Sequence, residues 1–237
     1  MIVGLLHPGE MGAAVGLVLQ SNGHEVLWAS AGRSEATRSR AGSFRDTGTV
    51  AALARDAELI LSICPPHAAG AVAQEVEGFR GTYVDANAIS PARAREIAAL
   101  HPRYVDGGIV GGPPRERGTM LYLSGSGAAA VAELFAGSVL AADVVANASA
   151  LKMAYAAWSK GTTALSLAIH RVARHFDVEE AWRLAAPEVA AGLPRAEHAA
   201  ETKGWRWVGE MEEIADTFAA ADEPDGFHRA AAEVFRS

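Results

Sequence analysis

The sequence predicts an α/β protein in which a doubly wound, mostly parallel sheet precedes a small all-α domain. Two observations support this prediction. In the first half of the chain, short apolar runs alternate with alanine-rich segments of helical spacing, which is typical of a parallel sheet that helices cover on both faces. From about Ser149 onward only helical patterns follow. We therefore expect two domains, residues 1–147 and residues 148–237.

Six apolar runs are expected to form strands. They are MIVGLL, HEVLWA, AELILSIC, GTYVDA, YVDGGIV and TMLYLSG. Between them, AAGAVAQEV and PARAREIAAL have the spacing of helices. The second domain begins with 28 residues, Ser149 to Phe176, that lack proline and predict one long, mostly buried helix with Gly161 as its weak point. Three helical patterns follow: VEEAWRLAAPEVAAGL, WVGEMEEIADTFAAA and GFHRAAAEVF.

The composition narrows the class of protein. Half of the 237 residues are hydrophobic, and the net charge of −7 includes no basic block, which argues against nucleic acid and an anionic membrane surface as partners. The single cysteine, Cys64, excludes an intrachain disulfide. The sequence shows no signal peptide, no membrane span, and no HxxH or CxxC spacing for a metal. We expect a cytoplasmic protein without a metal.

The turn after the first expected strand, GLLHPGEMG, stands where a dinucleotide-binding chain has the pattern G-x-G-x-x-G. Gly9 and Gly12 occupy the second and third glycine positions, whereas His7 replaces the first. Such a loop lets the backbone approach a pyrophosphate and turns the first N–H groups of a helix toward it. The alternative is an ordinary turn that begins a helix. We expect a coenzyme-binding loop made of His7, Pro8, Gly9, Glu10, Met11 and Gly12, with His7 mainly a turn residue.

The end of the second expected strand indicates which coenzyme is bound. About 20 residues after the loop, an NAD site has Asp or Glu for the ribose hydroxyls. This chain has Ser30 there, followed by Arg33 and Ser34. No carboxylate in this segment would repel a 2′-phosphate, and Arg33 can pair with one. We therefore expect that the coenzyme is NADP, with NAD as the alternative. The simpler explanation of Arg33 is that it is a solvated arginine in a loop.

Five motifs, taken in order, resemble the β-hydroxyacid dehydrogenases, the group that includes 3-hydroxyisobutyrate and 6-phosphogluconate dehydrogenases. They are GLLHPGEMG, SICPP, VDANAISP, VDGGIVGG and ALKMAYAA. HPGEMG, GGIVGGPP, ALKMAYAAWSKGT and WRWVGEMEEIAD are similar to a small branch of that group. The branch has a phosphogluconate-dehydrogenase-like NAD-binding (Rossmann) domain and a short C-terminal domain of unknown function. The resemblance extends from Met1 to about Phe235.

This resemblance implies a set of site residues. Lys152 matches the catalytic lysine of the family, and Val110 and Ala156 replace a serine and an asparagine that the family uses to hold substrate. Tyr155 is a substitute donor beside that second position. The cofactor is expected to be lined by Cys64, Pro65, Pro66 and Asn87, and the substrate by Val110, Gly111, Gly112, Lys152 and Tyr155.

Lys152, Tyr155 and Ser159 share one face of the long expected helix. A lysine in a cleft can pass a proton to or from a substrate oxygen while the nicotinamide carries the hydride. The simpler alternative is a lysine at the helix surface. The apolar helix needs more cover than the remaining residues supply, so we expect a homodimer with the active cleft between the two domains.

Three functions remain open from the sequence. The first is an NADP-dependent oxidoreductase that acts on a small hydroxy acid or its oxo form, with Lys152 as general acid and base. The second is an imine reductase that uses NADPH, although related imine reductases commonly lack this lysine. The third is a non-catalytic NADP-binding protein, which the apolar residues Val110 and Ala156 favour.

Overall fold

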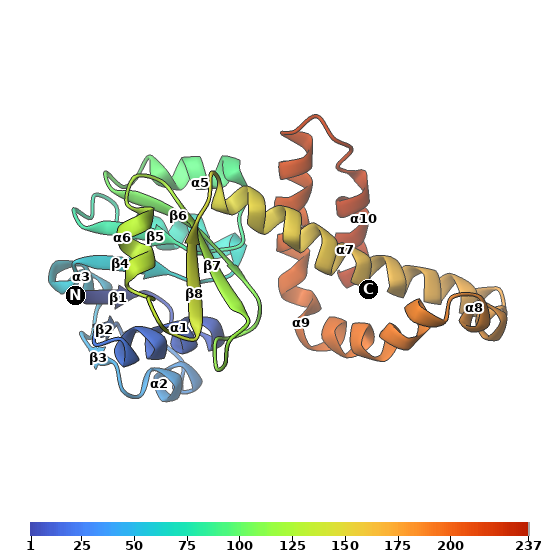
Figure 1. Ribbon diagram of the computed structural model, residues 1–237, viewed down its shortest axis with the longest axis horizontal. Helices are drawn as coiled ribbons and strands as arrows, with labels where there is room; N and C mark the ends of the chain where they lie inside the picture. Colours follow the sequence, from blue (N-terminus) through green and yellow to red (C-terminus); the bar gives the residue numbers. More distant parts are fainter. Residues whose placement is uncertain (237) are drawn as a thin grey trace. The chain divides into compact units, whose positions relative to one another are not determined.

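The computed structural model describes residues 1–236, which divide into two compact units, one from Met1 to Lys152 and one from Met153 onward (Figure 1). Helix α7 (Ala148–His175) begins in the first unit and continues into the second. The domain boundary expected after residue 147 coincides with the start of α7. The compact units instead meet after Lys152, because the first turn of α7 lies against the sheet.

The first unit is built on one eight-stranded sheet with the order β3-β2-β1-β4-β5-β6-β7-β8. Neighbouring strands are parallel except β6 and β7, which pair antiparallel. The predicted doubly wound, mostly parallel sheet is therefore confirmed. The strands are β1 (Ile2–Leu5), β2 (Glu25–Trp28), β3 (Arg45–Asp46), β4 (Leu59–Ser62), β5 (Thr82–Asp85), β6 (Tyr104–Val110), β7 (Thr119–Ser124) and β8 (Leu140–Val144).

The inner strands are buried on both faces. Leu59 and Leu61 of β4 belong to one hydrophobic cluster, whereas Ile60 between them belongs to the other. Alternate side chains of a strand point to opposite faces, so apolar runs such as AELILSIC are required where helices cover both sides. The covering helices are α1 (Glu10–Ser21), α2 (Glu35–Ala41), α3 (Val50–Asp56), the 3₁₀ turn η1 (Pro66–Ala68), α4 (Ala69–Gln74), α5 (Pro91–Ala98) and α6 (Ala128–Glu133).

Two strands were missing from the sequence prediction. β3 has only two residues, Arg45 and Asp46, and both are exposed. β8 is an edge strand whose side chains are mostly exposed, so it lacks the apolar run that marks the inner strands. Both strands pair with a neighbour that the sequence did predict, and that pairing defines them.

The parallel strands bring their carboxyl ends to one edge of the sheet. The chain leaves β1 into α1 there, beside the point where the strand order reverses between β2 and β4. The carboxyl end of β6 lies three strand spacings from β1, about 14 Å along the same edge. The expected coenzyme loop and the expected substrate turn therefore share one edge.

The second unit is entirely helical within the described residues. It contains the rest of α7, then α8 (Glu179–Ala185), α9 (Pro187–Ala219) and α10 (Gly226–Arg236). α7 continues through Gly161, so the expected weak point does not interrupt it. A Cβ at Gly161 would lie 3.3 Å from the ring of Phe227, so the glycine allows α10 to approach closely. None of the described helices is long and apolar enough to cross a membrane.

Helix α9 differs from the expectation of separate patterns before and after residue 200. α8 ends at Ala185 because Ala186, which precedes Pro187, leaves the helical conformation with φ −132° and ψ 59°. α9 then runs for 33 residues and includes Pro194, which did not end the helix. Figure 1 shows that α9 bends along its course.

Candidate functional site

The loop between β1 and α1 is built around two glycines with different roles. Gly9 is the N-cap residue of α1, and no side chain caps that helix. A Cβ on Gly9 would have no heavy atom within 4 Å, whereas a Cβ on Gly12 would lie 2.4 Å from the carbonyl oxygen of His7. Gly12 therefore permits close packing of the helix on the loop, and the space beside Gly9 is open. An anion-binding loop needs both properties.

His7 does more than turn the chain. Its Nε2 lies 2.6 Å from Nη1 of Arg33, and because arginine only donates, the imidazole proton stays on Nδ1. Nδ1 is buried and makes no hydrogen bond within residues 1–236. Burial, together with the charge of Arg33, lowers the pKa of His7 to about 4. The imidazole of His7 is therefore neutral at pH 7, and its Nδ1–H is a hydrogen-bond donor in the loop.

The other loop residues have structural surroundings. Pro8 is buried, and its carbonyl oxygen accepts a hydrogen bond from Nε of Arg40 at 3.2 Å. Met11 packs against the hydrophobic cluster beneath α1. Glu10 is exposed in the first turn of α1. The loop therefore offers its backbone rather than these side chains.

Three arginines gather at the carboxyl ends of β1 and β2. Besides Arg33, Nη2 of Arg38 donates to the carbonyl oxygen of Ser30 at 2.9 Å, and Arg40 reaches Pro8 as described. Arg38 and Arg40 lie on α2 and were not identified from the sequence. The sequence feature that could have identified them is RSR, two arginines just after the expected coenzyme segment. They lie on a short helix, from which both side chains reach back to the loop.

A carboxylate also lies at this edge, which corrects the expectation that none is near. Oδ1 of Asp46 accepts from the backbone amides of Ser30, at 3.1 Å, and Gly48, at 2.8 Å. The hydroxyl of Ser30 and these amides hold the pKa of Asp46 below its usual value. Asp46 was missed because β3, 16 residues after Ser30, brings it there in space.

The two serines near Arg33 are engaged by the chain itself. The hydroxyl of Ser30 bonds to Asp46, and Oγ of Ser34 caps α2 by accepting from the amide of Thr37 at 3.3 Å. The sequence predicted both as donors to a coenzyme phosphate. In the structure their hydroxyls fix the turn that presents Arg33, and their contact with a coenzyme stays a prediction.

The turn after β4 is held by Asn87, which follows β5. Its Oδ1 accepts from the amide of Cys64 at 2.6 Å, and its Nδ2 donates to Oγ of Ser62 at 3.1 Å. Burial, with the charge of Asp85, raises the pKa of the Cys64 thiol to about 12. Pro65 and the buried Pro66 lead into η1. In the structure the amide of Asn87 positions the Cys64–Pro66 turn. Its contact with a coenzyme, which the family resemblance implies, stays a prediction.

Lys152 lies in the first turns of α7, against the carboxyl end of β6. Its Nζ donates to the carbonyl oxygen of Ile109 at 2.8 Å. A Cβ on Gly108 would lie 2.8 Å from Cβ of Lys152 and 2.9 Å from the carbonyl oxygen of Ala148. The helix can therefore lie on β6 only because residue 108 has no side chain. The amine is held at the edge of the sheet that also carries the β1–α1 loop.

The expected substrate turn follows directly. Val110 ends β6, and Gly111 follows with a φ of +119°. A Cβ at Gly111 would lie 2.8 Å from Oγ1 of Thr119, so only glycine fits there. Oγ1 of Thr119 donates to the carbonyl oxygen of Gly112 at 2.6 Å, which fixes the turn. Tyr155 lies three residues after Lys152 in the second unit and is 44% exposed, so it is not a core residue.

Metal-binding side chains are not grouped in the part of the chain that the structure describes. Among residues 1–236, no cluster of three or more His, Cys, Asp or Glu side chains is placed to hold a metal ion. The site therefore consists of an uncapped glycine loop, three arginines, a carboxylate and one lysine amine.

Comparison with known proteins agrees with this architecture. Residues 173–237 match a family model described as a domain of unknown function, DUF1932. A search of curated proteins finds no match. Solved structures, by contrast, align along nearly the whole chain.

A conserved protein of unknown function, MTH1747, whose structure was described as similar to 3-hydroxyacid dehydrogenases, is 24% identical with a TM-score of 0.73, covering 100% of this chain and 96% of that one. The 3-hydroxyisobutyrate dehydrogenase of Mycobacterium tuberculosis, solved with L-serine, is 16% identical with a TM-score of 0.68, covering 99% and 92%. A reductive aminase from Aspergillus terreus, solved with NADPH and ethyl-5-oxohexanoate, is 17% identical with a TM-score of 0.59, also covering 99% and 92%.

These matches confirm the resemblance seen in the sequence. The chain has the fold of the 3-hydroxyacid dehydrogenases, and residues 173–237 of its second unit match the DUF1932 model.

The packing of α1 on its loop can be tested with two glycines that lie in helices. Gly12→Ala is expected to lower the free energy of unfolding by about 1–3 kcal/mol, because the new Cβ meets a backbone oxygen. Gly70→Ala in α4 is the matched control, since a Cβ there meets nothing within 4 Å and alanine favours a helix. Urea denaturation measures both. Equal stability of the two variants would contradict the packing role of Gly12.

Proposed function

We propose that the protein is an NADP-dependent oxidoreductase that transfers hydride between nicotinamide and a small hydroxy acid or its oxo form. The main support is the hydrogen bond that Nζ of Lys152 donates to the carbonyl oxygen of Ile109. This bond holds the amine at the sheet edge that also presents the uncapped β1–α1 loop. The similarity in fold to a 3-hydroxyisobutyrate dehydrogenase supports the same reaction class.

The residues at the edge fit a dinucleotide. The first amides of α1 lie beside the open space at Gly9, where a phosphate is stabilised by N–H groups and the helix dipole. Nδ1 of His7 and Nε of Arg33 are buried and make no hydrogen bond within residues 1–236, so each is a donor without an acceptor. Buried donors in that condition are costly, and an anionic ligand would supply the missing acceptors.

The charges at the end of β2 favour NADP over NAD. Arg33, Arg38 and Arg40 bring three positive charges to this region, against two carboxylates, Asp46 and Glu35 in the first turn of α2. Asp46 is engaged by the amides of Ser30 and Gly48 and serves the β3 turn. A 2′-phosphate placed here meets net positive charge, and arginine forms strong, charge-assisted bonds with phosphate oxygens.

This preference predicts a selective loss of affinity. Wild-type protein is expected to bind NADPH with a Kd on the order of micromolar, about −8 kcal/mol, and NADH more weakly. Arg33→Ala and Arg38→Ala should weaken NADPH binding by about 10- to 100-fold, with little effect on NADH, because each removes a charge-assisted bond. Quenching of tryptophan fluorescence measures the affinities.

Arg55→Ala is the matched control, since Arg55 is exposed and pairs only with Asp56 in the contacts described. Asp46→Asn separates the two coenzymes. If Asp46 instead binds ribose hydroxyls, that variant loses NADH affinity, and equal or tighter binding of NADH by the wild type would overturn the NADP preference.

Lys152 is the proposed general acid and base. When bound, the nicotinamide supplies or accepts the hydride. In the oxidation direction the amine of Lys152 takes the proton of the substrate hydroxyl, and in reduction its ammonium returns a proton to the same oxygen. The bond to Ile109 fixes the amine beside Val110–Gly112, where a small substrate would lie. Val110 and the buried Ala156 provide no polar group, so backbone and Lys152 carry more of the recognition.

Two other functions have specific support. The reductive aminase solved with NADPH shares the fold, which favours the reduction of C=N bonds as a second candidate. The apolar residues at positions 110 and 156 favour a third, a protein that binds NADP without turnover.

Turnover of NADPH with a panel of oxo acids and cyclic imines distinguishes these functions. Lys152→Ala is expected to lower turnover of oxo acids by about 10²-fold or more, because the proton donor is lost. Lys203→Ala, a change of an exposed lysine, is the control and should retain wild-type activity. Imine turnover that survives in Lys152→Ala would favour an imine reductase. Tight NADPH binding without turnover of any compound would favour a binding protein.

We also propose that the protein is a homodimer formed by its second unit. Contrary to the expectation of a mostly buried helix, exposed apolar side chains follow one another along α7 at intervals of three and four residues or their sum. This spacing forms a seam suited to another helix. We call it the α7 seam; it consists of Tyr155, Trp158, Leu165, Ile169, Val172 and Phe176.

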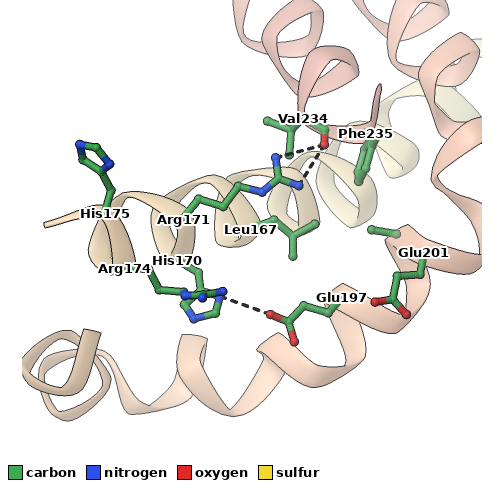
Figure 2. A pocket seen from close by; sticks show the side chains of 10 residues that line it. Leu167, His170, Arg171, Arg174, His175, Glu197, Glu201, Val234 and Phe235 are labelled. Carbon is green, nitrogen blue, oxygen red and sulfur yellow. Dashed lines mark hydrogen bonds and ion pairs between the residues drawn. The ribbon is translucent and has the colours of Figure 1, made fainter. Parts of the chain in front are cut away.

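Charge indicates what covers the seam. Helix α7 contains two lysines and two arginines and no acidic residue. We call residues 179–203 the α8–α9 arm; this segment contains five glutamates and three basic residues. Leu184 and Val189 of the arm are exposed, as is Val178 just before it. A cavity of about 590 Å³ lies within this unit. Figure 2 shows His170 of α7 facing Glu197 of α9, whereas the guanidinium of Arg171 points to the carbonyl oxygen of Val234. A two-fold pair of chains would lay each seam on the arm of its partner.

Light scattering coupled to size-exclusion chromatography tests the dimer. Wild-type protein is expected at twice the chain mass of 24.7 kDa, and Val172→Glu at the monomer mass, because a charge would be buried in the seam. Leu17→Glu is the matched control, since Leu17 on α1 is 52% exposed and Val172 is 57% exposed. A monomeric wild type at micromolar concentration would contradict the proposal.

A further inference from the structure

We infer that Asp106 is a positioning residue for Lys152: it fastens the first turn of α7 to β6 and so sets where the amine lies. This inference rests on the proposed role of Lys152 as the proton-transferring group.

Asp106 joins two strands and a helix. Its Oδ2 accepts from the amide of Ser149, at 2.8 Å, and from Oγ of Ser124, at 3.1 Å. Oγ of Ser124 in turn accepts from the amide of Ala148 at 3.0 Å. Asp106 and Ser124 are direct partners in the β6–β7 pairing, so the strands hold both acceptors in one place. The first two amides of α7 are thus bound by the sheet.

The same two elements meet again one turn further along. Ser149 and Lys152 are three residues apart and lie on one face of α7. On β6, Gly108 lies against Cβ of Lys152, and the carbonyl oxygen of Ile109 takes its Nζ. Asp106 therefore sets the register between strand and helix that the lysine uses. A slip of one residue would turn Lys152 by about 100° around the helix axis.

Capping alone does not explain Asp106. Oδ1 of Asn147 already accepts from the amide of Ala150 at 2.8 Å, which is the usual local cap of a helix. Asp106 comes from 43 residues before its helix partner and adds a connection to the sheet.

The buried carboxylate of Asp106 also lowers the stability of the fold. Oδ1 of Asp106 is buried without a hydrogen bond inside residues 1–236, and burial raises the pKa of this carboxyl group. A buried carboxylate with an unused oxygen is a poor way to hold a fold together. Its presence under the first turn of α7 favours a role in placing that turn.

The experiment uses the three lysines of the chain, Lys152, Lys160 and Lys203. Intact native protein is treated briefly with an acetylating reagent, and mass spectrometry gives the rate of modification at each lysine. In Asp106→Ala, Lys152 is expected to react about fivefold faster or more, as its bond to Ile109 loosens. Lys160 and Lys203 serve as internal standards and should keep their rates.

Two variants separate positioning from general stability. Asp106→Asn keeps an acceptor for Ser149 and should restore the slow reaction of Lys152, and Asp143→Ala removes an exposed aspartate of β8 and should change nothing. Ser124→Ala, which breaks the link between Asp106 and Ala148, should give an intermediate rate and serves if Asp106→Ala does not fold. An unchanged Lys152 rate in a folded Asp106→Ala or Ser124→Ala protein would overturn the inference.

Measuring NADPH binding in the same variants separates the positioning role of Asp106 from the proposed function. The β1–α1 loop lies three strands from β6, so the Asp106 variants should bind NADPH as the wild type does. Faster acetylation of Lys152 in a protein that never binds NADPH would support the positioning role while refuting the oxidoreductase.

Discussion

The close contact between α7 and β6 is the constraint on which the candidate site depends. The helix can reach the strand because Gly108 has no side chain, and Asp106, Ser124 and Ile109 then hold it with hydrogen bonds. The contact directs the amine of Lys152 to the carboxyl edge of the sheet. The parallel topology brings the β1–α1 loop to that same edge. The amine of Lys152 and the uncapped β1–α1 loop are thus brought to one edge of the sheet by backbone geometry within one compact unit.

Much of the fold could be predicted from the sequence. Apolar runs that are buried on both faces, as around Ile60, produce a strong signal, and all six strands predicted from such runs are present. β3 and β8 carry no such run and exist through their neighbours. The length of α9 was hidden by Pro194, since a proline inside a helix is tolerated when packing outweighs one lost hydrogen bond.

The candidate site was less predictable, because its partners are set by pairing in space. Asp46 reaches Ser30 through β3, and Arg38 and Arg40 reach the loop from α2. A direct contact with coenzyme was expected for Asn87 from the family resemblance and for Ser34 from its place after the second strand. In the structure the amide of Asn87 and the hydroxyl of Ser34 also secure turns, which the sequence did not reveal. A polar side chain at a strand end can thus shape a loop, and position in the chain alone does not reveal that role.

The imidazole at position 7 has a consequence for how such proteins are recognised. It occupies the place of a residue without a side chain, and its contact with Arg33 ties the loop to the segment after the second strand. A pattern search that demands three glycines would pass over this chain, although the helix still starts uncapped beside open space. Surveys for nucleotide-binding domains would do better to ask which backbone amides are left without acceptors than which letters precede them.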